Sequence, residues 1–115
     1  MEKFIKSFGY AFKGLAYAFR TQTNFRFHCL AVLTVVPLGL YVGLSLTEWL
    51  WIGSAIALVM MAELINTAIE VLVDLVSPQQ QARAGAIKDL SAAAVLIAAV
   101  LALVIALFIF APKLV

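Results

Sequence analysis

The sequence predicts an all-α membrane protein, in which an N-terminal amphipathic surface helix precedes three transmembrane helices. Of the 115 residues, 65% are hydrophobic and only 12% are charged, and the mean hydropathy is +1.09. A soluble domain of this size could not hide so much apolar surface, because small domains bury only about two-thirds of what the unfolded chain exposes. Three apolar runs are long enough to cross a hydrocarbon core of about 30 Å. We therefore expect one membrane domain over residues 1–115.

Residues 2–20 predict the amphipathic helix. At helical spacing, Lys6, Lys13 and Arg20 share one sector, while the apolar side chains fall within an arc of roughly 140°. This pattern is typical of a helix that lies on a membrane with its cations toward anionic headgroups. The apolar side chains in the arc are Phe4, Ile5, Phe8, Ala11, Phe12, Leu15, Ala16 and Phe19.

Three segments are predicted to span the membrane: about residues 27–46, 49–76 and 87–111. A turn around residues 45–48 joins the first two spans, and the polar loop of residues 77–81 joins the second to the third. Both connections consist of residues that favour surface positions.

Small and aromatic residues predict how the spans pack together and where one of them meets the membrane interface. Gly39 and Gly43, four residues apart in the first span, indicate close packing against another helix. In the third span, alanines recur every four residues, which also lets a helix approach closely: Ala94, Ala98, Ala102 and Ala106. Tyr41, Trp49 and Trp51 have the pattern of an aromatic belt at a membrane interface.

The positions of the Lys and Arg residues predict the orientation of the chain in the membrane. Five precede the first span and two lie between the second and third, whereas the turn between the first two spans has none. Because Lys and Arg accumulate on the cytoplasmic side, the N-terminus and the second loop are expected in the cytoplasm. The cations are Lys3, Lys6, Lys13, Arg20, Arg26, Arg83 and Lys88.

Polar residues within the second span are the main functional signal. Fourteen uncharged residues, about 21 Å of helix, separate the start of this span from Glu63. Glu63, Asn66, Glu70 and Asp74 then fall on one face of about 100°. Carboxylates at membrane depth are expensive and indicate function, although a hydrogen-bonded cluster that only joins helices is the alternative.

This arrangement suits phosphoryl transfer to a lipid alcohol at the membrane boundary. Glu63 can act as general base on the hydroxyl. Glu70, nearer water, can hold Mg²⁺ that bridges the phosphates of ATP. Lys88 can neutralise charge on the transferred group. The glycine-rich ATP-binding motifs of P-loop enzymes and protein kinases are absent, so ATP would bind by another route.

The stretch ELINTAIEVLVD, residues 63–74, resembles the signature of the small prokaryotic integral-membrane diacylglycerol kinases and undecaprenol kinases. The stretch AIKDLSAAAVLIAA, residues 86–99, is similar to the family's entry into its third span. GYAFKGLAYAF, residues 9–19, is similar to its amphipathic helix. The resemblance implies an ATP- and Mg²⁺-dependent lipid kinase in the bacterial cytoplasmic membrane, assembled as a homotrimer with active sites shared between subunits.

The resemblance also implies roles for single residues. Glu63 matches the catalytic base and Glu70 a metal ligand, with Asn66 and Asp74 as polar partners. The residues that match nucleotide-contacting positions are Lys3, Tyr10, Lys88 and Asp89.

One position departs from the family pattern. Gln22 stands where the diacylglycerol kinases have a glutamate that helps to bind metal and nucleotide. An amide oxygen can coordinate Mg²⁺ but brings no charge, so we expect either weaker metal binding by Glu70 and Gln22 or coordination mainly by Glu70 and phosphate.

Residues 24–28, NFRFH, resemble the undecaprenol kinases more than the diacylglycerol kinases. Undecaprenol is therefore the favoured substrate and diacylglycerol the next, with Asn24, Arg26, His28 and Asn66 as expected substrate contacts. Taken alone, His28 is interpreted as a headgroup-level residue rather than a proton shuttle.

Two other classes remain open from the sequence. A small multidrug-type transporter also uses an intramembrane glutamate, but it needs a fourth span and places the acid in its first. A non-catalytic membrane subunit would leave the polar face of the second span unexplained. Binding of nucleotide with Mg²⁺ separates the kinase from both.

Overall fold

The computed structural model describes all 115 residues and contains four α-helices and no strands. They are α1 (Glu2–Thr21), α2 (Thr23–Val42), α3 (Leu46–Val76) and α4 (Ala82–Leu114). The last three are long and apolar enough to cross a membrane. The predicted fold class, an amphipathic helix followed by three spanning helices, is confirmed.

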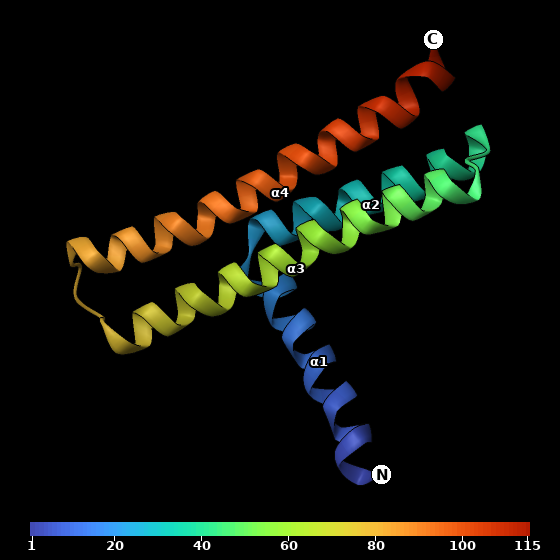
Figure 1. Cartoon of the computed structure of the whole chain (residues 1–115). Coiled ribbons are helices and arrows are strands. Elements are labelled where there is room, and N and C mark those ends of the chain that lie inside the picture. The colour runs from blue at the N-terminus through green and yellow to red at the C-terminus, as the bar shows by residue number, and fades with distance from the viewer.

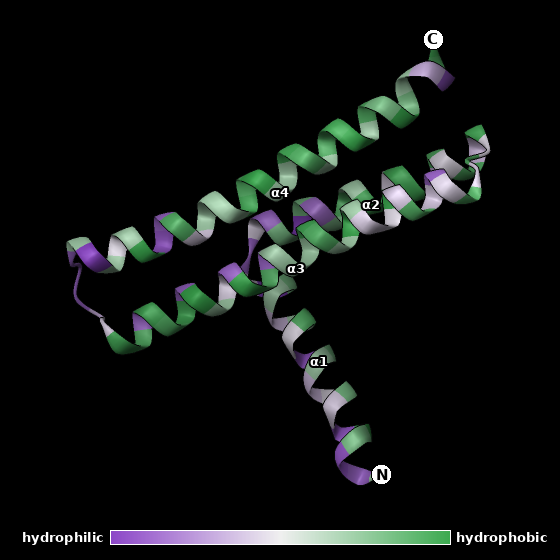
Figure 2. Cartoon of the chain, viewed as in Figure 1, coloured by the Kyte–Doolittle hydropathy of each residue, from purple (hydrophilic) through white to green (hydrophobic).

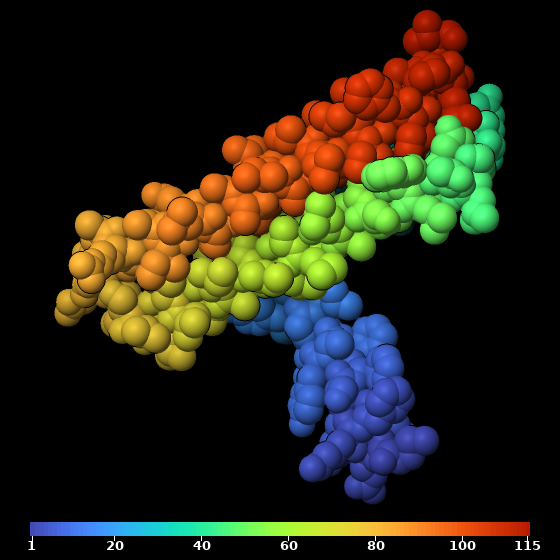
Figure 3. Space-filling model, viewed as in Figure 1, coloured from blue at the N-terminus to red at the C-terminus, as the bar shows by residue number.

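The helices form a three-helix bundle with an arm. Helices α3 and α4 make an antiparallel hairpin and share the largest interface, while α2 lies beside both. Figure 1 shows α1 leaving this bundle crosswise, with its N-terminus far from the other helices. In the space-filling view the first half of α1 stands free as a separate arm (Figure 3).

The spanning helices differ in length, and this difference positions the site. At 1.5 Å per residue, the 20 residues of α2 span about 30 Å, whereas the 31 of α3 and 33 of α4 span about 46 and 50 Å. Helix α2 therefore begins beside the middle of α3 (Figure 1). We call the end of the bundle with the α3–α4 loop the loop end, and the opposite end the turn end. The hairpin extends past α2 at the loop end.

A single extended residue separates α1 from α2. Gln22 has φ −115° and ψ 111°, which redirects the chain between two helices. Arg26 holds the joint, because its Nη1 donates to the carbonyl oxygens of Phe19 at 2.9 Å and Arg20 at 3.0 Å. These are among the last carbonyls of α1, which have no partner within the helix. The connection between the amphipathic helix and the first span is thus the single residue Gln22.

The turn between α2 and α3 differs from the predicted one. Gly43 ends α2 in the left-handed conformation, with φ 75°, and Ser45 starts α3 with a capping box that includes Glu48. The first span is therefore Thr23–Val42 rather than residues 27–46, because the glycine that ends α2 and the serine that caps α3 are only two positions apart.

The two glycines of α2 have different roles. A Cβ on Gly39 would lie 2.7 Å from Trp49 Cη2, so the indole packs directly on this glycine. Nothing within the chain lies within 4 Å of a Cβ on Gly43, so it packs against no helix of its own chain, and its positive φ is what requires glycine there. Trp49 accordingly faces α2, while Tyr41 and Trp51 are exposed.

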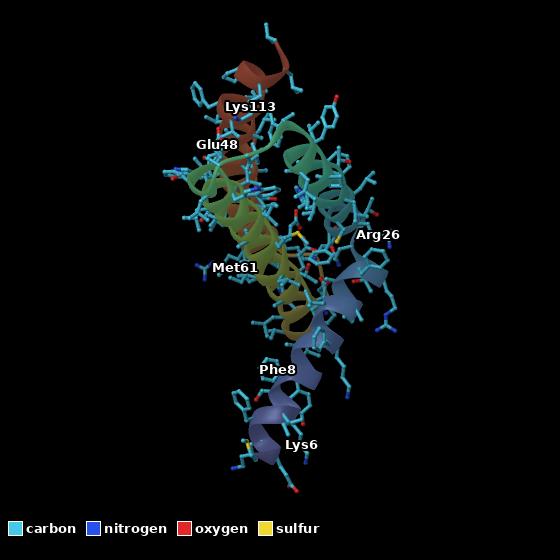
Figure 4. All side chains as sticks on the ribbon, turned by 90° about the vertical axis from the view of Figure 1, so that its right-hand side faces the viewer. Lys6, Phe8, Arg26, Glu48, Met61 and Lys113 are labelled. Atoms are coloured by element: carbon cyan, nitrogen blue, oxygen red, sulfur yellow. The ribbon has the colours of Figure 1, made fainter.

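At the turn end, Leu44, Ile52 and Phe110 form a small buried cluster. Beside it Lys113 Nζ lies 3.1 Å from Glu48 Oε1 and ties the end of α4 to the start of α3. Figure 4 shows the two side chains together, at the end of the molecule opposite α1.

Most apolar side chains point outward. Only 14 of 115 residues are buried, so the bundle lacks the core of a soluble domain of this length. The hydropathy colouring is almost uniformly apolar along α4 beyond its first turns, whereas polar positions gather at the loop end and along α1 (Figure 2). A bilayer or further copies of the chain must cover this surface.

Candidate active site

The polar face of α3 is buried where the three spanning helices meet the joint between α1 and α2. Glu63, Asn66 and Thr67 are 2%, 8% and 5% exposed, and Glu70 is half-buried one turn further on. They share one side of α3 because they are spaced three or four residues apart. The face thus runs from the bundle interior toward the loop end.

Glu63 is the deepest acidic residue. Its Oε1 is the only fully buried side-chain oxygen or nitrogen without a hydrogen-bond partner. His28 of α2 brings Nε2 to 3.2 Å from this oxygen, within ion-pair distance, but the ring N–H does not point at it. The hydroxyl of Thr67 donates to the Glu63 backbone carbonyl at 2.9 Å and leaves the carboxylate free.

A hydrogen-bonded chain connects Glu70 to α4. Asn66 Nδ2 donates to Glu70 Oε1 at 3.1 Å, and Ser91 Oγ donates to Asn66 Oδ1 at 2.5 Å. Ser91 was not among the predicted site residues. The available signal was its position as a lone hydroxyl three residues after Lys88, on the same face of the helix.

Lys88 and Asp74 pair across the α3–α4 hairpin. The Nζ–Oδ1 distance is 2.6 Å, and both side chains are partly exposed. Exposed ion pairs contribute only about 0–1 kcal/mol, so Lys88 is held weakly. Asp89 is exposed on the next position of α4.

The other predicted site residues form no hydrogen bond or ion pair with this cluster within one chain. Lys3 and Tyr10 are exposed on the first half of α1, where the Lys13 ammonium lies over the Tyr10 ring. Gln22 donates to neighbouring Thr21 and Asn24 is exposed. Arg26 is occupied by the carbonyls at the end of α1.

The acidic side chains of this site are its possible ligands for a divalent cation. No group of three or more His, Cys, Asp or Glu side chains is close enough to hold a metal ion by itself. Mg²⁺, however, is usually bound by only one or two carboxylates together with substrate phosphates. Glu70, half-buried and steadied by Asn66, fits such a ligand.

Two hollows flank the cluster. An apolar groove of about 310 Å³ lies between α2, α3 and α4, and His28 is the one lining residue that is not hydrophobic. A polar pocket of about 540 Å³ surrounds the α3–α4 loop and includes Asp74 and Lys88. The polar face of α3 thus has a hydrocarbon-lined space toward one end and a polar space at the other.

Comparison with known proteins agrees with this chemistry. The family described as prokaryotic diacylglycerol kinase matches residues 9–110. An undecaprenol kinase of Bacillus subtilis (strain 168) is 42% identical over 114 residues, covering 99% of this chain and 93% of that protein. A diacylglycerol kinase of Escherichia coli (strain K12) is 34% identical over 102 residues, covering 89% and 84%. One of Haemophilus influenzae is 35% identical over 94 residues, covering 82% and 80%.

These matches cover nearly the whole chain, including the polar face of α3 and the start of α4. The transporter and the non-catalytic subunit, which the sequence alone left open, are set aside because the relatives named here are all lipid kinases. A membrane bundle with a buried carboxylate at the level of its surface-helix joint fits that activity. The chain belongs to the prokaryotic diacylglycerol kinase family and is a lipid kinase.

Proposed function

We propose that this protein transfers the γ-phosphate of ATP, with Mg²⁺, to the hydroxyl of a membrane lipid alcohol at the cytoplasmic interface. Undecaprenol is the favoured acceptor and diacylglycerol the next. The observation that carries this proposal is Glu63: a carboxylate 2% exposed, with one oxygen lacking any hydrogen-bond partner. Burying such a group in a membrane costs free energy, and a residue kept there at that cost indicates a functional site.

Glu63 acts as the general base. The lipid's hydrocarbon chain lies along the apolar groove, whose lining reaches His28, and its hydroxyl comes to the Glu63 carboxylate. The carboxylate takes the hydroxyl proton as the lipid oxygen attacks the γ-phosphorus and ADP leaves. The polar end of the lipid contacts exposed Asn24 in the first turn of α2, Arg26 once it releases a carbonyl of α1, and the second N–H of the Asn66 amide.

The nucleotide binds toward the loop end. Glu70 lies about 10 Å further along α3 than Glu63. Steadied by Asn66, it would hold Mg²⁺, which would neutralise phosphate charge. Lys88 leaves Asp74 for the phosphates, a small cost because the ion pair is partly exposed. Asp89 and Asp74 complete the polar surroundings.

A homotrimer completes the site. Lys3, Tyr10 and Gln22 form no hydrogen bond or ion pair with Glu63, Glu70 or Lys88 in one chain. Their proposed role at the nucleotide therefore requires α1 of a second copy, in line with the predicted sharing of active sites. The many exposed apolar side chains on α2, α3 and α4 offer the surface for such assembly.

The preference for undecaprenol has two supports. The segment Asn24–His28 resembles the undecaprenol kinases, and the Bacillus subtilis relative of that name is 42% identical over 99% of this chain. The diacylglycerol kinases of Escherichia coli and Haemophilus influenzae are 34% and 35% identical over shorter segments.

Phosphate transfer tests the proposal directly. Detergent-purified protein is given labelled ATP with undecaprenol and diacylglycerol side by side, with and without Mg²⁺. Transfer that requires Mg²⁺ and prefers undecaprenol is expected. Preference for diacylglycerol would reverse the order of substrates, and transfer without any divalent cation would remove Mg²⁺ from the site.

A further inference from the structure

His28 is the only polar side chain that α2 brings to the proposed base. Its Nε2 lies 3.2 Å from Glu63 Oε1, and its side chain is 21% exposed where that of Glu63 is 3%. It is also the one histidine of the chain. The imidazole thus stands between a buried carboxylate and the surface.

The other polar side chains near this carboxylate do not donate a hydrogen bond to its Oε1. The nearest hydroxyl, that of Thr67, is turned to the backbone carbonyl of Glu63, and Asn66 is engaged by Glu70 and Ser91. A buried polar atom without a partner costs about 1–3 kcal/mol, and a charged one more. The carboxylate therefore gains most from the imidazole beside it.

The contact has the length of a hydrogen bond without being one. Distance is already satisfied, and only the direction of the ring N–H is not. Turning the imidazole about its Cβ–Cγ bond changes that direction without moving either helix. The Phe27 ring packs nearly at right angles to the imidazole, with centroids 6.0 Å apart.

We infer that His28 is a positioning residue for the base rather than a contact for the lipid headgroup. Its Nε2–H holds Oε1 of Glu63, so that the second carboxylate oxygen faces the incoming hydroxyl. This inference rests on the proposed role of Glu63. It gives His28 a function that acts through Glu63, whereas a headgroup contact would act on lipid affinity.

Two substitutions separate the roles. His28→Gln keeps an N–H donor at nearly the place of Nε2, while His28→Phe keeps a flat ring and removes the donor. We expect kcat to fall about 10- to 100-fold in the Phe variant, a part of the factor that a general base supplies, with the KM for lipid unchanged. The Gln variant should recover to within about threefold of the wild type, and Cys29→Ala, the next residue of α2, serves as the control.

A raised KM for lipid with unchanged kcat in both His28 variants would overturn the inference in favour of a headgroup contact. Wild-type kcat in His28→Phe would overturn it in favour of a space-filling ring. If Glu63→Gln is itself as active as the wild type, the proposed base fails, and that result is separate from either outcome.

A spectroscopic measurement needs neither activity nor a folded His28 variant. Because the chain has one histidine, its imidazole ¹⁵N resonances in detergent are unambiguous. We expect the Nε2 shift to change between the wild type and Glu63→Gln at fixed pH, and to stay unchanged in Glu48→Gln at the far end of α3. Identical Nε2 shifts in all three proteins would show that the imidazole does not hold Glu63.

Discussion

Ser91 on α4 donates a hydrogen bond to Asn66 on α3, with 2.5 Å between Oγ and Oδ1. The amide then uses its nitrogen to hold Glu70 at 3.1 Å. A single hydroxyl on one helix therefore fixes the rotamer of an amide, and through it the direction of a carboxylate on the next turn. The α3–α4 interface and the proposed metal ligand are coupled through these three side chains.

Ser91→Ala tests this coupling. The change leaves the buried Asn66 oxygen without a donor, which costs about 1–3 kcal/mol, and it frees Glu70 to rotate. We expect a lower midpoint of thermal unfolding in detergent together with a higher Mg²⁺ concentration for half-maximal activity. Ser54→Ala is the matched control, because that hydroxyl is exposed and bonds only to Leu50 of its own helix. Equal effects of both changes would show that Ser91 has no special role.

Glu63→Gln tests the proposed base. The substitution keeps the size of the side chain and removes the proton acceptor, so kcat should fall about 10²- to 10⁴-fold. Nucleotide binding, followed by equilibrium dialysis, and the midpoint of thermal unfolding should change little. Glu48→Gln makes the same chemical change near the start of the same helix and should keep its activity. A Glu63→Gln protein with normal turnover would require another base.

Glu70→Gln tests the metal ligand. Loss of the charge should shift the Mg²⁺ dependence of phosphate transfer to higher concentration or abolish transfer, since Mg²⁺ favours carboxylate oxygens. The measurement is a Mg²⁺ titration of initial rate at saturating ATP. A titration that matches the wild type would move the metal to a different carboxylate, with Asp74 the next to test.

Gly39→Ala tests the packing at the turn end. The added Cβ would lie 2.7 Å from Trp49 and 2.9 Å from a methyl group of Leu44, and such overpacking costs about 1–3 kcal/mol. We expect a lower unfolding midpoint with the kcat of the remaining folded protein unchanged. Gly53→Ala, where nothing lies within 4 Å of the new carbon, should leave the midpoint equal or higher. Trp49→Leu combined with Gly39→Ala should restore part of the loss.

The sequence predicted the elements well because each carries a local signal. The helical period of Phe and Lys predicted α1, and apolar length predicted the three spans. The spacing of Glu63, Asn66 and Glu70 placed them on one face of α3, although their roles remain predictions. The boundary of α2 was missed because Gly43 was interpreted as a packing residue when its conformation ends the helix.

The contacts between helices could not be predicted in the same way. The pairs Ser91–Asn66, His28–Glu63 and Lys113–Glu48 each depend on how far one helix slides along another. That register between two helices is set by packing over many side chains, and no single residue predicts it. The structure therefore adds partners to a site whose main residues the sequence had already suggested.

Because α2 is short, the thickness of the bilayer can change the rate of the reaction. Its 20 residues match an average hydrocarbon core of about 30 Å with little to spare, and α1 runs crosswise from its start. A thicker membrane must thin locally around the protein, whereas a thinner one must tilt the bundle. Either adjustment changes the depth at which His28 and Glu63 meet the headgroups, so lipid composition can alter turnover without touching a substrate contact.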